Sequence, residues 1–208
     1  YTIISKIIDF NMNNQSKLTK YFVQYAEKVD ELFAPYANCD ELNILYMAEL
    51  DSRSDDFDFL KRVEKTLKKQ KCTESDLFNR VNREIYKLNP SASSAYLMAV
   101  NSIKNRNYLD AISYAKEAIE MESESNLKAS YYLILADAYR SSGSFSSARS
   151  SVYSALKYKK GWGEAYMSLG NIYVSGAKNC GEGFEMQSVY WVAVDAYKKA
   201  LNDQINGY

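Results

Sequence analysis

The stretch Tyr132-Leu-Ile-Leu-Ala-Asp-Ala-Tyr139 decides the fold, because the chain repeats its pattern. The same spacing of tyrosine, leucine, a small residue and tyrosine returns in Tyr166-Met-Ser-Leu-Gly-Asn-Ile-Tyr173, and a fainter copy precedes both in Ala95–Ser102. A period of 34 to 37 residues is typical of stacked helical hairpins rather than of a closed enzyme fold. The interval is measured between the central small residues Ala99, Ala136 and Gly170.

Each copy is followed by a second segment with alanine at helical spacing. Its small and apolar positions are Ala111, Ala115 and Ala118, then Ala148, Val152 and Ala155, then Ala193, Tyr197 and Ala200. The pattern predicts three helix pairs. Their ranges are 92–105 with 108–121, 126–141 with 145–158, and 163–175 with 188–203.

The first 90 residues also have helical periodicity. Leu18 to Leu32 form one apolar face that ends near Pro35, and residues 39–50 form the next predicted helix. Ser54 and the acids Asp55, Asp56 and Asp58 are expected to open a helix over about 55–70. Thr73-x-x-Asp76 resembles a capping box for the helix after it. With two prolines in the chain and no glycine before Gly143, we expect helix throughout and no strand.

Composition is that of a soluble globular protein, with 47% hydrophobic and 25% charged residues. The 26 basic and 26 acidic residues cancel, which argues against nucleic-acid partners. No apolar run is long enough for direct membrane insertion. The chain has no histidine, the commonest general base and metal ligand, and its acids form no convincing catalytic pair. We therefore predict no enzyme activity, no catalytic residues, no metal and no cofactor.

The repeats resemble the tetratricopeptide family, on the small residues and alanines named above, over about 92–203. This resemblance implies an all-α, right-handed superhelical stack of antiparallel helix pairs, a TPR-like α-solenoid, here of about eleven helices. Residues 1–90 would form degenerate N-terminal repeats. Residues 91–208 would form three repeats, the third with an insertion at about 176–187.

Longer strings resemble a narrower group, the tetratricopeptide proteins of the Bacteroidota cell envelope. They are Leu32-Phe-Ala-Pro-Tyr36, Lys71-Cys-Thr-Glu-Ser-Asp-Leu-Phe78, Asn89-Pro-Ser-Ala92 and Tyr190-Trp-Val-Ala-Val-Asp195. The resemblance implies an exported or periplasmic protein-interaction or scaffolding module of poorly defined role. The alternatives are a ligand- or glycan-binding module, which would need an exposed Trp162 or Trp191, and an accessory domain of a larger protein.

Cys39 and Cys72 come just before one predicted helix and just after the next, so an antiparallel hairpin would bring them to the same end. Two buried thiols are the alternative. The envelope resemblance implies an oxidising compartment and favours a disulfide. Cys180, in the insertion, would then be available to pair with a residue outside this chain.

In the tetratricopeptide family the first helix of each pair lines a concave face that binds a protein or peptide. The positions that match it here are Tyr96, Val100, Ile103, Leu133, Asp137, Arg140, Met167, Asn171 and Val174. These side chains make a mildly apolar groove, and they exclude the basic carboxylate clamp of the chaperone-binding members. The alternative is a solvated or self-packed face.

The basic residues between Lys61 and Lys71 follow a run of acids and close a predicted helix, so a solvated face is expected there. The last helix pair has no polar capping helix after it. Its outer side is therefore predicted to be unusually apolar.

Overall fold

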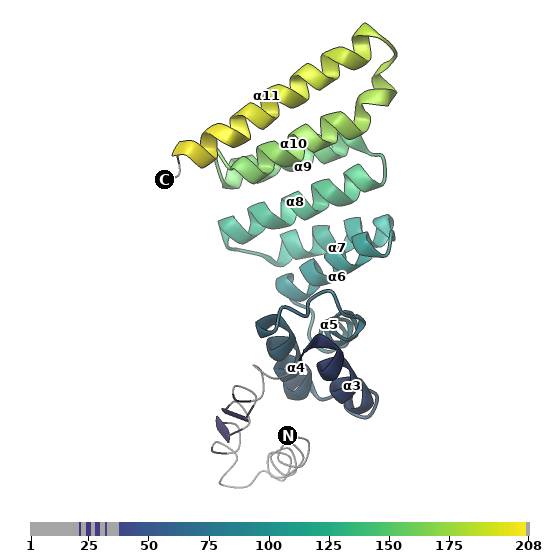
Figure 1. Ribbon diagram of the computed structural model, residues 1–208, viewed down its shortest axis with the longest axis vertical. Coiled ribbons are helices and arrows are strands. Elements are labelled where there is room, and N and C mark those ends of the chain that lie inside the picture. Colours follow the sequence, from purple (N-terminus) through teal and green to yellow (C-terminus); the bar gives the residue numbers. More distant parts are fainter. Residues whose placement is uncertain (1–20, 22–23, 26–27, 30–31, 33–37, 207–208) are drawn as a thin grey trace. The chain divides into compact units, whose positions relative to one another are not determined.

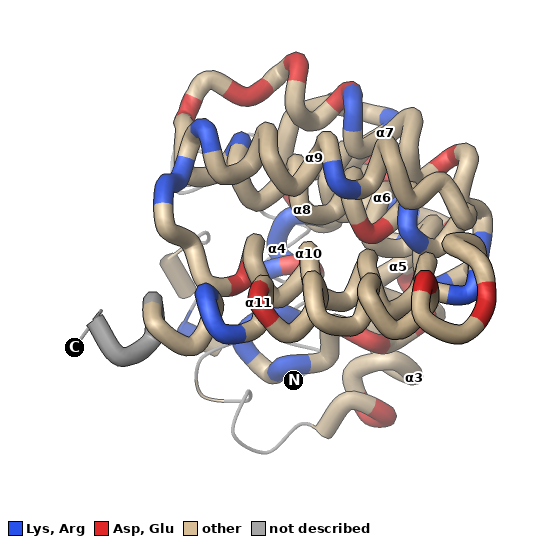
Figure 2. The backbone as a smooth tube through the Cα atoms, turned by 90° about the horizontal axis from the view of Figure 1, so that it is seen from above, with Lys and Arg blue, Asp and Glu red and all other residues tan. Residues whose placement is uncertain are grey.

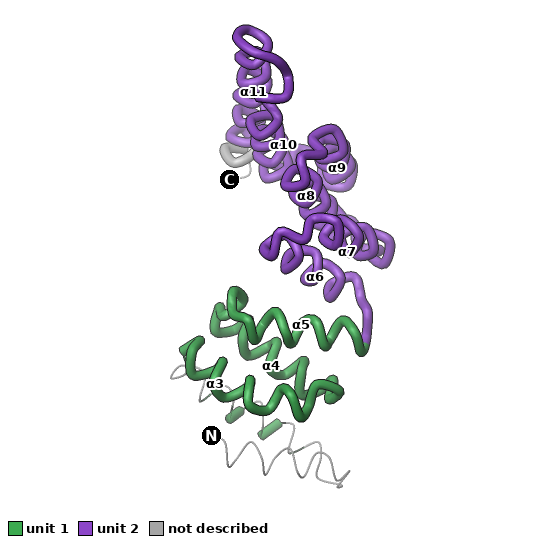
Figure 3. The backbone as a smooth tube through the Cα atoms, turned by 90° about the vertical axis from the view of Figure 1, so that its right-hand side faces the viewer, with its two compact units in different colours: residues 1–88 green, residues 89–208 purple. Residues whose placement is uncertain are grey.

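The computed structural model describes residues 21, 24–25, 28–29, 32 and 38–206. Residues 38–206 hold nine α-helices and one short 3-10 helix, with no strand among them (Figure 1). The helix predicted to end near Pro35 lies almost entirely outside the described residues. The chain divides into two compact units, Tyr1–Leu88 and Asn89–Tyr208, which are coloured green and purple in Figure 3.

Unit 1 contains α3 (Cys39–Leu50), α4 (Phe57–Lys69) and α5 (Asp76–Leu88), and each of these helices contacts the other two. Their core faces are strongly apolar and almost fully buried, which is where most of the stability of helices this short comes from. The buried side chains include Leu42, Tyr46, Leu50, Phe59, Leu60, Val63, Leu67, Leu77, Val81 and Ile85.

The helix starts of unit 1 refine one detail of the sequence prediction and correct another. Among the residues expected to open α4, Asp56 is the cap, and it accepts the backbone N–H of Phe59 at 2.9 Å. Ser75, rather than Thr73, accepts the backbone N–H of Phe78 at 3.2 Å at the start of α5. In both cases several capping side chains are adjacent, and the final choice depends on where the preceding turn ends.

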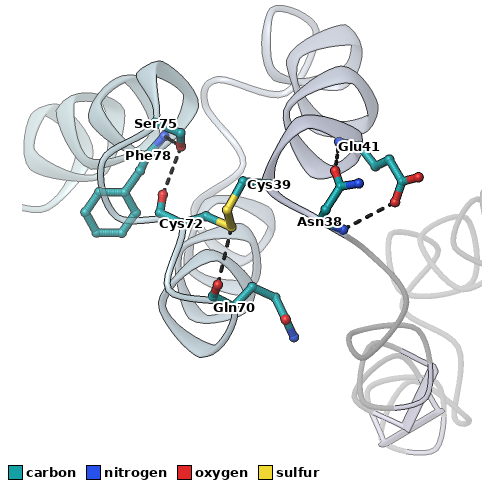
Figure 4. The surroundings of a disulfide bond; sticks show 7 residues. All are labelled: Asn38, Cys39, Glu41, Gln70, Cys72, Ser75 and Phe78. Carbon is teal, nitrogen blue, oxygen red and sulfur yellow. Dashed lines mark hydrogen bonds between the residues drawn. A yellow bond between two sulfur atoms is a disulfide. The ribbon is translucent and has the colours of Figure 1, made fainter.

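The predicted disulfide between Cys39 and Cys72 is confirmed (Figure 4). Cys39 is the first residue of α3, and Cys72 follows the end of α4, with 5.5 Å between the two Cα atoms. Asn38 and Glu41 cap the same end of α3 reciprocally, since each side chain accepts the backbone N–H of the other residue. The bridge and the capping box together hold the start of α3 against the end of α4.

Unit 2 consists of six α-helices that follow one another in antiparallel pairs (Figure 1). The pairs are α6 (Ala92–Lys104) with α7 (Tyr108–Met121), α8 (Ser125–Ser141) with α9 (Phe145–Tyr158), and α10 (Gly163–Gly176) with α11 (Phe184–Asn206). The repeat alanines are fully buried where the helices cross, because only small side chains allow such close approach. The fold class predicted from the repeats, an all-α stack of antiparallel helix pairs, is therefore confirmed.

The connection inside the third pair differs from the predicted one. A 3-10 helix, η2 (Ala177–Cys180), follows α10 directly, and α11 starts at Phe184, four residues before the predicted start at 188. Much of the extra sequence is therefore helical, and Gly181 and Gly183 make the turn between η2 and α11 with φ of 110° and 59°. These positive φ angles favour glycine.

Candidate partner-binding groove

The first helices of the three pairs lie next to one another, since α8 contacts both α6 and α10. The predicted groove residues occupy equivalent positions on one face of these helices, because each set has the same i, i+4, i+7 spacing. On α6 and α8 all of them are half-buried, and on α10 all of them are exposed. They are Tyr96, Val100 and Ile103 on α6, Leu133, Asp137 and Arg140 on α8, and Met167, Asn171 and Val174 on α10.

At the α6 end, Tyr96 is half-buried because its ring stacks on Tyr131 of α8, with 5.0 Å between the ring centroids. Burial raises the pKa of Tyr96. Burial, and then the charge and hydrogen bond of Glu122, raise the pKa of Tyr131 to about 12. The two rings thus form a neutral aromatic wall between neighbouring repeats.

In the middle of the groove, α8 contributes one apolar and two charged side chains. Leu133 packs against the core of the second and third repeats and is only partly available to a partner. Asp137 and Arg140 form an ion pair one helical turn apart, in which the Arg140 Nε donates to Asp137 Oδ1 at 3.1 Å. The pair leaves a polar spot on an otherwise apolar face.

At the α10 end, Met167 and Val174 have 46% and 41% of their surface exposed. Between them Asn171 accepts a hydrogen bond from the Tyr197 hydroxyl of α11 at 2.9 Å through its side-chain oxygen. This bond leaves the amide N–H₂ of Asn171 as the part that can donate to a bound peptide. The face can therefore offer apolar contacts, one ion pair and one amide.

Two residues of this region, Tyr131 and Glu122, were not identified from the sequence, whereas Trp191 was named from it as a candidate for glycan binding. Tyr131 and Glu122 support the groove from outside the repeat motif, and their pairing depends on the angle between α6 and α8. Trp191, on α11, is 59% exposed and has Phe184 edge-on at 5.8 Å between ring centroids. Tyrosines in a repeat usually fill gaps between helices, so the pattern alone could not single out Tyr131.

The basic segment of α4 is ordered around a buried acid. Lys61 and Lys68 reach the Glu64 carboxylate at 2.5 and 2.6 Å, while their own side chains remain about half exposed. Burial alone would raise the pKa of Glu64, but these two ammonium groups hold it below its usual range.

Among the residues that the structure describes, no group of three or more histidine, cysteine, aspartate or glutamate side chains could hold a metal ion. No described helix has the length and hydropathy required to span a bilayer. Cys180 is exposed and forms no disulfide among the described residues.

Comparison with known proteins shows relatives in fold only. No protein-family model matches the chain, and no curated protein matches it. A solved structure titled "Crystal structure of MamA" aligns with a TM-score of 0.62 at 20% identity, over 86% of this chain and 96% of that one. A second, "Crystal structure of MamA protein", aligns with a TM-score of 0.60 at 20% identity, over 85% of this chain and 88% of that one. At this level of identity the likeness shows the fold alone, which is that of a TPR-like helical solenoid.

Proposed function

We propose that this chain is a non-enzymatic protein-interaction module that binds a peptide or helix along the groove on α6, α8 and α10. The observation that carries the proposal is the alignment of accessible, largely apolar side chains at equivalent positions of three adjacent helices. Stacked helical hairpins use such continuous faces for peptide recognition. The likeness to the two MamA structures supports the fold on which this proposal rests.

The charge distribution supports a protein partner over a nucleic acid. Basic and acidic residues are interspersed along the described helices (Figure 2), and the net charge is zero. Nucleic-acid binding usually requires a basic patch or stripe that follows the phosphate backbone. The groove instead has an internally neutralised pair, Asp137 and Arg140, among apolar residues.

The groove is tested by placing a photo-crosslinking amino acid at Val100. The matched control carries the same group at Leu109 of α7, which is 82% exposed but lies outside the groove. We expect irradiation in native extracts to capture one protein at Val100 and not at Leu109, and Val100→Glu to weaken binding of that protein. Equal capture at Val100 and Leu109 would contradict the proposal that the partner binds in the groove.

We further propose that the protein functions in a bacterial cell envelope, in an oxidising compartment. The Cys39–Cys72 disulfide supports this location, because such bonds persist mainly outside the cytosol. Cell fractionation followed by mass spectrometry of non-reduced peptides should find the bond in the envelope fraction. Alkylation of both thiols in freshly lysed cells would contradict this location.

A second function, glycan binding, is favoured by one observation. Trp191 is exposed, whereas Trp162 packs against the repeat core with the Lys159 ammonium 4.3 Å from its ring centroid. An exposed indole can stack on the apolar face of a sugar. Titration with soluble polysaccharides should change the tryptophan fluorescence of the unmodified chain. The Trp191→Ala variant should not show this change. No response in the unmodified chain would exclude this function for the polysaccharides used.

A further inference from the structure

Five apolar side chains of the last helix pair are exposed, although their equivalents in the two earlier pairs are not. We call these five residues the end seat: Met167 and Val174 on α10, and Tyr190, Val194 and Leu201 on α11. Their exposed fractions lie between 37% and 56%. The α11 members form one strip, because their spacing of four and seven residues matches the helical repeat.

The repeat register gives the equivalent residues directly. On α8 and α9 they are Leu133, Arg140, Phe145, Arg149 and Leu156, and on α6 and α7 they are Tyr96, Ile103, Tyr108, Ile112 and Ile119. All ten are half-buried or buried. Leu201 and Leu156 are the same residue type, and Tyr190 corresponds to the aromatic residues Phe145 and Tyr108. At these positions the difference in exposure comes from what covers the side chains and not from their size.

In the earlier pairs the cover is the first helix of the next pair. An added Cβ at Gly176 of α10 would meet the Phe145 ring at 3.1 Å, and the Arg149 guanidinium lies 5.6 Å from the Tyr173 ring centroid. Leu156 packs on the cluster that contains Ala165 of α10. In the same way Tyr131 of α8 covers Tyr96 of α6. Small residues at the crossing points allow this close contact.

We propose that the end seat binds one amphipathic helix of the same chemistry as α10, in the position that α10 occupies on α8 and α9. Such a helix has small residues where it crosses the seat, as Ala165 and Gly176 do in α10, and aromatic residues beside them. The seat continues the interfaces by which α8 packs on the first helix pair and α10 on the second, and α11 is the last described helix of unit 2 (Figures 1 and 3). Met167 and Val174 also belong to the groove proposed above, whereas Tyr190, Val194 and Leu201 do not. Substitutions at Val194 and Leu201 therefore test the end seat separately from the groove.

The test uses the full chain and a synthetic peptide with the sequence of residues 162–176. A lactam between Glu164 and a lysine in place of Ser168 keeps the peptide helical on its outward side, because isolated helices of this length are marginal. Binding is measured by fluorescence anisotropy. A second peptide carries Ala165→Glu, which places a charge at the crossing point.

We expect saturable binding to the unmodified chain and at least about tenfold weaker binding to Val194→Glu and Leu201→Glu, as for central contacts of an interface. Leu109→Glu, an exposed leucine on α7, and Val100→Glu, in the groove, should bind as the unmodified chain does. Both seat substitutions are at exposed positions, and unchanged melting curves will show that the fold is retained.

Three results would overturn the proposal. They are no saturable binding of the peptide, equal binding by the seat variants, and equal binding of the Ala165→Glu peptide. Analytical ultracentrifugation tests whether a second copy of the chain occupies the end seat. A dimer that is lost in Leu201→Glu would assign the seat to a second copy of the chain and would also overturn the proposal. Peptide binding that is weakened by Val100→Glu but not by the seat variants would place the peptide in the groove and would likewise overturn the proposal.

Discussion

Gly170 and Tyr197 are matched in size at the crossing of α10 and α11. A Cβ at Gly170 would overlap the Tyr197 ring. The equivalent pair in the second repeat is Ala136 with Val152, in which the first-helix residue is larger and the second-helix residue smaller. In these two repeats the space between the paired helices is thus divided differently between the two sides.

We therefore predict that Gly170→Ala lowers the stability of unit 2 by about 1–3 kcal/mol, because the added methyl group must displace a packed ring. Gly170→Leu should cost more, whereas Val174→Ala, at an exposed position, should cost little. Adding Tyr197→Val to Gly170→Ala should recover part of the loss. Chemical denaturation of the four variants of this cycle measures the coupling. Strictly additive effects would show that the two residues do not share one space.

Glu64 makes the stability of unit 1 sensitive to acid. Its folded pKa is lower than the usual value of 4.5, since the Lys61 and Lys68 hydrogen bonds outweigh burial. The stabilisation is therefore complete above pH 4.5 and is lost as the pH falls through the folded pKa. Glu64→Gln should destabilise by about 1–2 kcal/mol at pH 7, because the lysine ends remain partly solvated.

The pH profile separates this effect from a loss of packing. The difference between Glu64→Gln and the unmodified chain should shrink below about pH 4.5, where the carboxyl group itself becomes neutral. Urea unfolding at several pH values, followed by circular dichroism, gives this difference. A penalty of the same size at pH 3 and pH 7 would assign the effect to shape rather than charge.

Among the elements, three helices end in the same turn, with one residue in the left-handed region and a backbone hydrogen bond closing six residues. The residue with positive φ is Lys71 after α4, Arg106 after α6 and Gly143 after α8, at 59°, 61° and 80°. The closing bonds run from Cys72 to Leu67, Asn107 to Ser102 and Ser144 to Tyr139, each at 2.8 Å. This is the Schellman arrangement, which glycine suits best.

Arg106→Gly is therefore expected to stabilise unit 2 by about 0.5–1 kcal/mol, because glycine adopts a positive φ without steric cost. Gly143→Ala, at the equivalent turn, should destabilise by a similar amount. Thermal melts of both variants check the pair. A lower melting temperature for Arg106→Gly would show that the arginine side chain makes a contact that outweighs the backbone strain.

At the scale of the whole molecule, breaking the disulfide is a way to destabilise unit 1 without changing unit 2. Cys39 and Cys72 both belong to unit 1, and the bond closes a loop of 33 residues. Loop entropy gives a stabilisation of about 3–4 kcal/mol for a loop of this size. Both tryptophans, Trp162 and Trp191, belong to unit 2 and report its unfolding.

Reduction should therefore shift an early transition in far-ultraviolet circular dichroism while the tryptophan fluorescence transition stays nearly constant. The double variant Cys39→Ser and Cys72→Ser should behave like the reduced chain. Cys180→Ser is the matched control and should change neither transition, because Cys180 forms no bond to the other two. An equal shift of both transitions on reduction would show that the units unfold together.

The sequence by itself determined the helices, their pairing and the all-α fold. Repeat spacing and small residues at every crossing are local patterns, and one arrangement of packed helices satisfies them all. Hairpin geometry placed Cys39 and Cys72 at the same end, and the resemblance to cell-envelope proteins favoured a disulfide over two buried thiols. The nine groove residues follow from repeat register, and their binding role stays a prediction.

Only the tertiary structure decided which side chains are covered. Ser75 rather than Thr73 caps α5 because the turn after Lys71 sets the first helical residue. The packing of Tyr96 on Tyr131 depends on the angle between neighbouring helices, which no local pattern records. Leu156 and Leu201 have the same residue type and register, yet one is covered by α10 and the other is 56% exposed. Burial depends on neighbours distant in sequence, so only the tertiary structure distinguishes a core position from a candidate binding surface.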